Sequence, residues 1–390
     1  MRVIHVADNH LGRRQYGLVE REEDFREAFR EFIDRALALR PDAVVHSGDL
    51  FEHYKPSPLD LVEAFRGLRE FTDRGIPVYI VAGNHDLGPA PGGGRMSPLP
   101  LLEETLGPGL VHLGYHKPIS SDGPVTVAGL PYTPRQEVGE LKRALAAIGE
   151  KVAGCRGPRI LVLHQAVYPA APKNASELSE SELGRLSFDY FAMGHIHDRT
   201  FWREERVRRP ISYSGSTEIV EEREARSYRI RGKGFYLLEF EDGFVKIRPH
   251  TLESVRPFIS LGVRAFSREE LEEALSTLVE NVERAGGRKR PLVKVTVEVR
   301  DPRAAEIFER RVREELEDRV LRLVILPRIA GREVEVRRAE RADLGEMIEA
   351  MLEDEDAKRL ARLLWRLRLE GKGREEIVRE IERWYERWGP

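Results

Sequence analysis

Five short segments of the chain carry side chains that could bind metal ions and hydrolyse a phosphate ester. They are Asp8 with His10, Gly48-Asp49, Gly83-Asn84-His85-Asp86, His164, and Gly194-His195-Ile196-His197. Carboxylate, amide and imidazole groups are the donors that hard or borderline divalent cations take in proteins. Together the segments predict a site for two cations that acts on a phosphoester.

Asp49 is the natural bridge, because one carboxylate can place an oxygen on each of two cations. The other donors then divide into two sets: Asp8 and His10 with one of His195 and His197, and Asn84 and His164 with the other of these two histidines. Two cations held in this way bind a phosphodiester oxygen and lower the pKa of water, so that no protein nucleophile is required.

His85 is the candidate acid of the reaction. It lies next to Asn84 in the sequence, so its ring can reach the edge of the cation pair without being a ligand. A hydrogen bond to Asp86 would keep the ring protonated, ready to stabilise the transition state and donate to the leaving oxygen. The remaining histidines are interpreted as core or surface residues: His5, His46, His112, His116 and His250.

Each of the five segments follows a short apolar run. The runs are residues 4–6, 43–45, 78–81, 160–163 and 191–193. Short runs rich in β-branched or aromatic residues are typical of buried strands. Because an α/β sheet presents its loops at the carboxyl ends of its strands, we expect the five segments to converge on one rim.

The composition limits the classes of protein to consider. The chain has 390 residues, 41% hydrophobic and 34% charged, which is enough for two or three cores. No uncharged apolar stretch reaches the roughly 18 residues that cross a bilayer, so we expect a cytoplasmic protein. The single cysteine, Cys155, excludes an intrachain disulfide and is expected to be a partly buried thiol near a loop.

The net charge of -3 gives no overall signature of nucleic-acid binding. A nucleic-acid substrate would therefore need local positive patches. The candidate patches are Arg13 with Arg14 and the basic residues within 199–209, 229–233 and 288–290.

Residues 1 to about 250 alternate strand and helix signals. Apolar residues recur at helical spacing between Phe25 and Leu37, and Pro41 closes that segment, which predicts a β-α-β unit. Residues 88–100 are rich in Gly and Pro and predict a surface loop. Residues 235–240 and 244–248 predict a hairpin.

Residues 251–335 follow the order strand, helix, strand, helix, strand. Ser267 and Glu270 form a capping-box pattern, and Pro302 opens the second helix. From residue 336 three amphipathic helices are predicted. They must pack on the preceding domain or on a partner helix, because short helices cannot bury such faces alone.

The motifs resemble the calcineurin-like metallophosphoesterase superfamily, and within it the archaeal double-strand-break repair nucleases termed SbcD or Mre-eleven. The matching motifs are Ala7-Asp8-Asn9-His10-Leu11-Gly12, Ser47-Gly48-Asp49-Leu50-Phe51, Gly83-Asn84-His85-Asp86, Leu163-His164-Gln165, Gly194-His195-Ile196-His197 and Ser214-Gly215-Ser216. The resemblance covers the first 250 residues closely and the remainder loosely.

The resemblance implies an α/β fold in which two mixed β-sheets flanked by helices form the core. It implies a nuclease domain at 1–250, a DNA-capping α+β domain at 251–335 and a helical tail at 336–390 that binds a Rad-fifty or SbcC ATPase. It also implies a homodimer, with Leu61, Phe65, Leu99 and Leu102 as counterparts of the family's contacts.

The implied activities are 3′-to-5′ exonuclease on duplex DNA and endonuclease on single strands, with two Mn²⁺ ions and catalytic His85. One ion would be held by Asp8, His10, Asp49 and His197, and the other by Asp49, Asn84, His164 and His195.

One position departs from the resemblance, since Glu52 and then His53 stand where the family commonly has His or Asp. Both residues are left outside the catalytic set. Two other functions stay open: a phosphoesterase for nucleotides or other small phosphodiesters, and a DNA-binding scaffold with a vestigial metal site.

Overall fold

The computed structural model describes residues 1–155, 157–200, 206–285, 287 and 289–330, together with the single positions 363 and 380. The chain divides into two compact units, residues 1–297 with 306–326 and residues 298–305 with 327–390. The predicted C-terminal helices lie outside the described residues. The division into domains at about 250 and 335 stays a prediction.

The first sheet has seven strands in the order β13-β16-β15-β1-β2-β3-β6. β1, β2, β3 and β6 run parallel, whereas β15 is antiparallel to β1 and pairs with β16 across the predicted hairpin. The bounds are β1 (Arg2–Val6), β2 (Ala43–His46), β3 (Val78–Val81), β6 (Leu110–Leu113), β13 (Arg206–Val207), β15 (Gly234–Glu241) and β16 (Phe244–Thr251).

The second sheet has five strands in the order β14-β12-β9-β8-β7. All are parallel except β7, which runs antiparallel to β8. The bounds are β7 (Ile119–Ser120), β8 (Thr126–Leu130), β9 (Arg159–His164), β12 (Tyr190–Gly194) and β14 (Ile211–Tyr213). Two further strand pairs are short: β4 (Gly88–Pro89) with β5 (Arg95–Met96), and β10 (Val167–Tyr168) with β11 (Leu178–Ser179).

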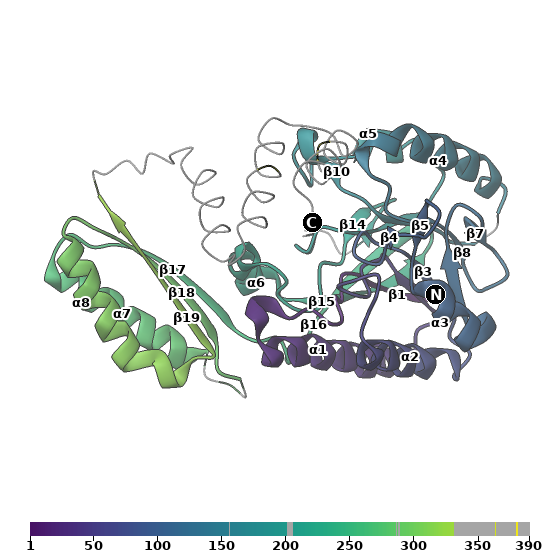
Figure 1. Ribbon diagram of the computed structural model, residues 1–390. Coiled ribbons are helices and arrows are strands. Elements are labelled where there is room, and N and C mark those ends of the chain that lie inside the picture. The colour runs from purple at the N-terminus through teal and green to yellow at the C-terminus, as the bar shows by residue number, and fades with distance from the viewer. Residues whose placement is uncertain are drawn as a thin grey trace. The chain divides into compact units, whose positions relative to one another are not determined.

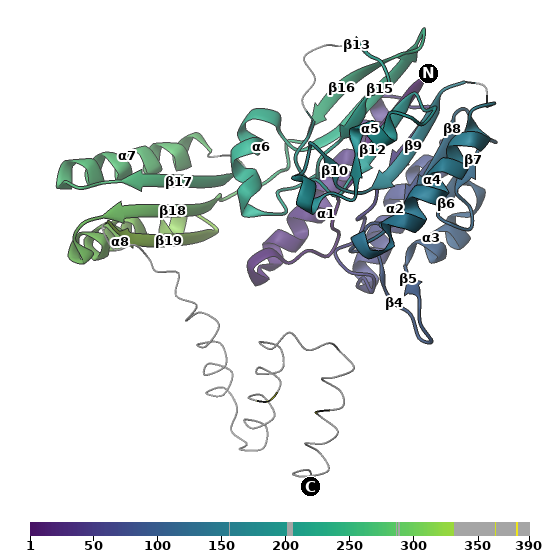
Figure 2. The ribbon, with the colours of Figure 1, turned by 90° about the horizontal axis from the view of Figure 1, so that it is seen from above.

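The two sheets pack face to face with helices outside them (Figures 1 and 2). Between the sheets, Val45 and Val81 of the first sheet pack with Ile160 and Val162 of the second. The helices are α1 (Val19–Ala38), α2 (Pro58–Thr72), α3 (Leu99–Leu106), α4 (Val138–Val152), α5 (Glu180–Leu183) and α6 (Ala225–Arg231). Residues of α1, α2 and α3 share one core with the first sheet, and residues of α4 share another with the second.

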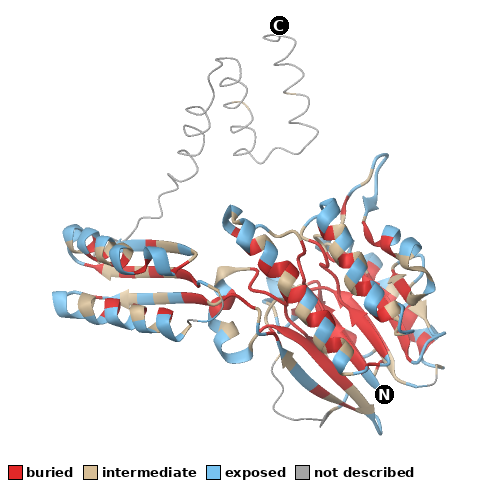
Figure 3. Cartoon of the chain, turned by 90° about the horizontal axis from the view of Figure 1, so that it is seen from below, coloured by how far each residue is buried: buried red, intermediate tan, exposed pale blue. Residues whose placement is uncertain are grey.

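The apolar stripe of α1 behaves as its spacing predicts. Phe25, Phe29 and Phe32 are buried in the core, and the helix ends at Ala38, before Pro41. Figure 3 shows the central strands as largely buried and the outer faces of the helices as exposed. The predicted core of two mixed sheets flanked by helices is confirmed.

The segment after residue 250 has the predicted order of elements: β17 (Phe258–Arg264), α7 (Arg268–Arg284), β18 (Leu292–Val299), α8 (Pro302–Leu316) and β19 (Arg322–Ile329). The three strands form a sheet in the order β17-β18-β19. Ser267 caps α7 and makes the predicted capping box with Glu270. The small α+β segment is therefore confirmed.

Two expectations are corrected. The Gly-Pro segment 88–100 is not all loop, because it holds the β4-β5 hairpin and α3 begins at Leu99.

Leu99 and Leu102, expected at a dimer contact, are 0% and 3% exposed inside the chain's own core. Leu61 and Phe65 are partly buried against the same core. The exposed apolar side chains of α2 and α3 are instead Leu59, Val62 and Leu101.

Within the described part of the chain, no helix combines the length and apolar character needed to span a membrane.

Candidate metal centre

The five predicted segments meet at the carboxyl ends of β1, β2, β3, β9 and β12. The first three strands belong to the seven-stranded sheet and the other two to the five-stranded sheet. The predicted rim therefore exists, but it is shared by two sheets. Because parallel strands in both sheets end on the same side of the interface between them, side chains from both reach one site.

The backbone turns sharply where the strands end. Asp8, Asp49 and His195 have positive φ angles of 55°, 52° and 85°. Non-glycine residues rarely adopt this conformation, and such local strain is concentrated at functional sites. Neighbouring glycines allow the loops at the strand ends to approach one another closely. A Cβ on Gly83 would collide with Asp49, and one on Gly194 would collide with the Ser47 carbonyl.

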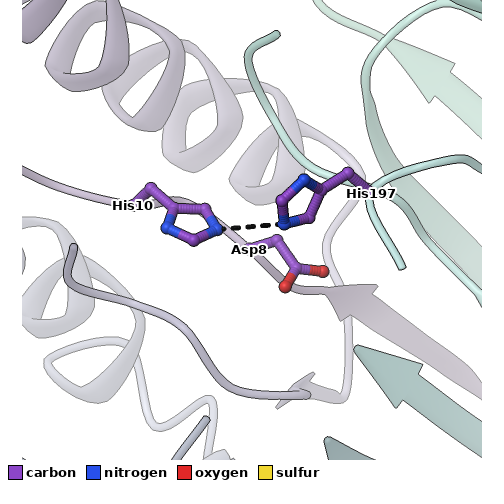
Figure 4. Close-up of side chains that lie close together, drawn as sticks. All are labelled: Asp8, His10 and His197. Carbon is purple, nitrogen blue, oxygen red and sulfur yellow. Dashed lines mark hydrogen bonds between the residues drawn. The ribbon is translucent and has the colours of Figure 1, made fainter. Parts of the chain in front are cut away.

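Asp8, His10 and His197 form one close group of donors (Figure 4). The Nε2 atoms of the two histidines face each other at 3.2 Å. Asp8 Oδ1 accepts a hydrogen bond from the His195 backbone N–H at 3.1 Å. The other oxygen, Oδ2, is buried and has no hydrogen-bond partner among the described residues.

Asp8, Asp49 and His164 form a second close group. Asp49 Oδ2 lies 3.2 Å from His164 Nε2 and 3.8 Å from His10 Nε2, so this carboxylate of the second group also reaches the first. Asn84 Oδ1 lies 3.1 Å from His164 Nε2 and 2.9 Å from His195 Nδ1. All seven predicted ligands are therefore brought together.

These residues fit a pair of divalent cations. A buried carboxylate oxygen without a hydrogen-bond partner is costly, and a cation at Asp8 Oδ2 would remove that cost. Two facing imidazole nitrogens can share only one proton between them in the neutral state, whereas both can bind metal. Oxygen and nitrogen donors, with no sulfur among them, suit borderline or hard cations but do not identify the metal.

The close packing of these groups changes their pKa values. Burial raises the pKa of Asp8. Burial acts to raise the pKa of Asp49, yet His164 at contact distance holds that pKa well below the usual range. Although burial alone would lower it, the charge of Asp49 raises the pKa of His164 to about 9. His164 and Asp49 therefore favour each other's charged forms, and a cation bound between them would take the place of the His164 proton.

Two carboxylates outside the predicted set hold the outward nitrogens of two of the histidines. Glu52 Oε2 lies 2.8 Å from His10 Nδ1, and Glu224 Oε1 lies 2.7 Å from His197 Nδ1. Such partners fix the ring orientation and tautomer of a metal-binding histidine. Sequence reasoning missed both roles. Glu52 could have been found from its place directly after Gly48-Asp49-Leu50-Phe51, but Glu224 lies in no motif.

The structure corrects the predicted environment of His85. The Asp86 carboxylate accepts backbone N–H groups of Leu50, Phe51 and Gly83, whereas His85 Nδ1 lies 2.9 Å from the Glu52 carbonyl oxygen. The predicted His85–Asp86 hydrogen bond is therefore wrong. His85 nevertheless lies at the site, because its ring is 4.9 Å from that of His10 and its backbone N–H donates to Asp49.

His5 and His46, predicted as core or surface residues, are buried beside the site. His5 Nδ1 lies 2.9 Å from the Tyr190 hydroxyl and Nε2 lies 3.0 Å from Ser47 Oγ, while His46 Nε2 lies 2.6 Å from Asn9 Oδ1. Burial lowers the pKa of each imidazole to about 3. Both histidines are therefore neutral hydrogen-bonding groups in the core.

We expect the buried His5 to make the metal-free protein sensitive to acid. Its folded pKa, about 3, lies below the unfolded value of about 6.5, so only the unfolded chain gains a proton between these values. Stability present above about pH 6.5 is then lost as the pH falls towards 3, by up to about 1.4 kcal/mol per pH unit. Denaturant unfolding in the presence of chelator should show a shallower pH dependence for His5→Gln. The exposed His116→Gln should match wild type, and equal slopes in all three proteins would contradict the prediction.

Comparison with known proteins agrees with this arrangement. Residues 1–199 match the calcineurin-like phosphoesterase family, and the chain belongs to this family. It is similar to proteins named "DNA double-strand break repair protein Mre11". One from Methanococcus maripaludis is 36% identical over 63% of this chain and 64% of that protein. One from Methanocaldococcus jannaschii is 36% identical over 62% of this chain and 63% of that protein.

A further relative of the same name, from Thermoplasma acidophilum, is 33% identical over 70% of this chain and 72% of that protein. The matches to the first two relatives span less than two thirds of those proteins. The resemblance read from the sequence motifs is confirmed.

Proposed function

We propose that this chain is a metal-dependent DNA nuclease of double-strand-break repair that hydrolyses phosphodiesters. The observation that carries the proposal is that two donor groups, which share Asp8 and which Asp49 links, lie together at the rim of a calcineurin-like phosphoesterase fold. The similarity to proteins named for double-strand-break repair supports DNA as the substrate. A cytoplasmic location in a prokaryote, at the nucleoid, accords with this substrate.

The proposed ligands divide between two Mn²⁺ ions. Asp8, His10, Asp49 and His197 hold one, and Asp49, Asn84, His164 and His195 hold the other. The first set is supported by the approach of His10 and His197 to 3.2 Å, and the second by the contacts of Asn84 Oδ1 with His164 and His195.

The cations, when bound, polarise the phosphodiester and supply hydroxide from water near neutral pH. The chain's own residues position the catalytic histidine and supply the proton for the leaving oxygen. Asp49 fixes the His85 backbone through a 2.8 Å hydrogen bond, and the Glu52 carbonyl holds His85 Nδ1. His85 Nε2 is then the atom that donates a proton to the leaving oxygen. The proposed activities are 3′-to-5′ exonuclease on duplex DNA and endonuclease on single strands.

Several basic residues that were candidates for DNA contact are instead paired with groups of the protein itself. Arg13 pairs with Glu52, Lys233 with Glu224, and Lys289 with Asp24. The buried Arg199 donates to backbone carbonyls. The DNA backbone must therefore be bound by other basic side chains, and Arg14, which is exposed, remains a candidate.

The test of the substrate is a comparison of linear duplex DNA with a small chromogenic phosphodiester. With saturating Mn²⁺ we expect the ratio of kcat to KM to favour DNA strongly. Equal or better turnover of the small diester would support the alternative, a phosphoesterase for nucleotides or other small phosphodiesters. Absence of cleavage of either compound would support a scaffold with a vestigial site.

We further propose that the tail from about residue 336 binds a Rad-fifty or SbcC type ATPase and that the α+β segment at 251–335 caps DNA. The apolar stripes of the tail sequence support a partner helix. Homodimerisation is proposed through the exposed Leu59, Val62 and Leu101 of α2 and α3. These large apolar side chains are exposed on the protein and are available to pack against a second copy of the chain.

Truncation after about residue 340 is expected to preserve Mn²⁺-dependent DNA cleavage and to abolish binding of the ATPase. The reason is that all proposed metal ligands lie between Asp8 and His197. Co-purification measures ATPase binding, and light scattering of the truncated protein should still give a dimer mass. Unchanged co-purification would contradict the role of the tail, and a monomer mass would contradict the dimer surface.

A further inference from the structure

The histidines of the proposed centre are held by groups of different charge. In the half of the site that contains His10 and His197, both outward Nδ1 atoms face carboxylates, Glu52 at 2.8 Å and Glu224 at 2.7 Å. In the other half, the outward Nδ1 of His164 lies 2.7 Å from the carbonyl oxygen of Ser47. His195 turns its Nδ1 inward, to Asn84. The two halves therefore differ in how their imidazoles are supported.

Glu52 is itself fixed in place. Its Oε1 accepts a 2.6 Å hydrogen bond from Arg13 Nη1, and Arg13 Nε donates to the Val220 carbonyl at 3.1 Å. The backbone N–H of Glu52 donates to the Leu11 carbonyl at 2.9 Å. The glutamate side chain thus spans from the loop after β2 to the imidazole of His10 with both oxygens engaged.

Glu224 is held still more firmly. Its side chain is 2% exposed and pairs with Lys233, whose side chain is equally buried. Its two oxygens also accept the backbone N–H groups of Val220 and Glu221 at 3.1 and 2.9 Å. Lys233 in turn donates to the His197 carbonyl at 2.9 Å. Both the ring and the backbone of His197 are therefore tied to one buried ion pair.

A carboxylate partner raises the basicity of a metal-binding imidazole more than a neutral carbonyl does, and loss of such a partner typically costs 10–100-fold in metal affinity. We propose that Glu52 and Glu224 are positioning residues that make the two halves of the centre unequal. The half with His10 and His197 binds its cation tightly, and the half with His164 and His195 binds weakly and fills last. This inference rests on the proposed function, because it uses the ligand sets assigned there.

The ligand charges favour the same order. In the ligand sets proposed above, Asp8 is assigned to the first set only and Asp49 is shared, although the Asp8 carboxylate also lies close to Asp49 and His164. The second set otherwise contributes the neutral amide of Asn84. A more negative set of oxygen donors binds a divalent cation more strongly. The weakly held second cation would then be the one whose occupancy sets activity at limiting metal.

The experiment is a titration of the metal-free full-length chain with Mn²⁺, followed by calorimetry and by the electron paramagnetic resonance signal of free Mn²⁺. Wild type should show two classes of site, one tight and one weak. Asn84→Ala should remove the weak class and leave the tight one. Glu52→Gln should weaken the tight class by about 10–100-fold and leave the weak class unchanged. None of these readouts depends on DNA cleavage.

Glu239→Gln is the matched control, because Glu239 is also a partly buried carboxylate, 17% exposed, that pairs with Arg2 and Arg248 away from the site. It should bind Mn²⁺ as wild type does. Glu224→Gln should weaken the tight class as Glu52→Gln does. Because Glu224→Gln leaves the charge of Lys233 without its partner, thermal melting must show that this variant is folded. If it is unfolded, the Mn²⁺ affinities of Glu52→Gln alone test the inference.

Equal affinities of the two sites in wild type would overturn the inference, as would an unchanged tight class in Glu52→Gln or an equal weakening of both classes. Failure of wild type to bind any Mn²⁺ would instead overturn the proposed function. Two equal sites together with DNA cleavage would overturn only the inequality.

Discussion

An Asp49→Ala variant is expected to lose both cations and, with them, all measurable DNA cleavage. Asp49 belongs to the second donor group and reaches the first, with Oδ2 at 3.2 Å from His164 Nε2 and 3.8 Å from His10 Nε2. It is also the carboxylate common to both proposed ligand sets. Removing it therefore weakens both halves of the site, whereas removing any other ligand affects one half directly.

The loss should exceed the roughly 10²–10³-fold that removal of a single stabilising donor costs in other enzymes. Calorimetry with Mn²⁺ and cleavage of linear duplex DNA measure the two effects separately. Asp73→Ala is a suitable control, because Asp73 is exposed at the end of α2 and pairs with Arg69 one helical turn earlier. Cleavage by Asp49→Ala at a rate near that of wild type would contradict the proposed bridge.

A His85→Ala variant is expected to keep both cations and DNA binding while its cleavage rate falls by about 10²–10⁴-fold, the usual contribution of a general acid. The His85 side chain is 34% exposed, so its removal opens no cavity in the core. The backbone N–H that holds Asp49 is retained in alanine. The Glu52 carboxylate also remains on His10.

This outcome would show that His85 acts as an acid and is not a metal ligand. Calorimetry should give the Mn²⁺ affinities of wild type, and a filter-binding assay should give its DNA affinity, with the loss confined to kcat. The neighbouring exposed His53→Ala should cleave as wild type does. Loss of both cations in His85→Ala would show that His85 is a ligand and would overturn its assignment as the acid.

The local sequence determined the strands and the donors at their ends. The strand predicted at residues 78–81 has the same bounds in the structure, because a short apolar run rich in β-branched residues specifies a buried strand directly. The donor that follows each buried strand is fixed by chain order alone. The candidate ligands could therefore be identified without coordinates.

Only the tertiary structure decided which groups surround those donors. Lys233 and Arg13 look like surface cations in the sequence, yet each neutralises a carboxylate that supports a histidine. The family resemblance implies Leu99 and Leu102 as dimer contacts, but both are buried in the chain's own core. Such pairings depend on which distant segments the packing of two sheets brings together, and no local pattern encodes that.

The same distinction applies to the metal centre itself. The sequence determined that Asp8, Asp49, Asn84 and the histidines stand at strand ends. The packing of the two sheets decided that these ends share one site, that Glu52 and Glu224 hold His10 and His197, and that Asp86 serves the backbone rather than His85. The physical reason is that strand formation depends on neighbouring residues, whereas the hydrogen-bond partners of a buried polar group are set by whichever segments exclude water around it.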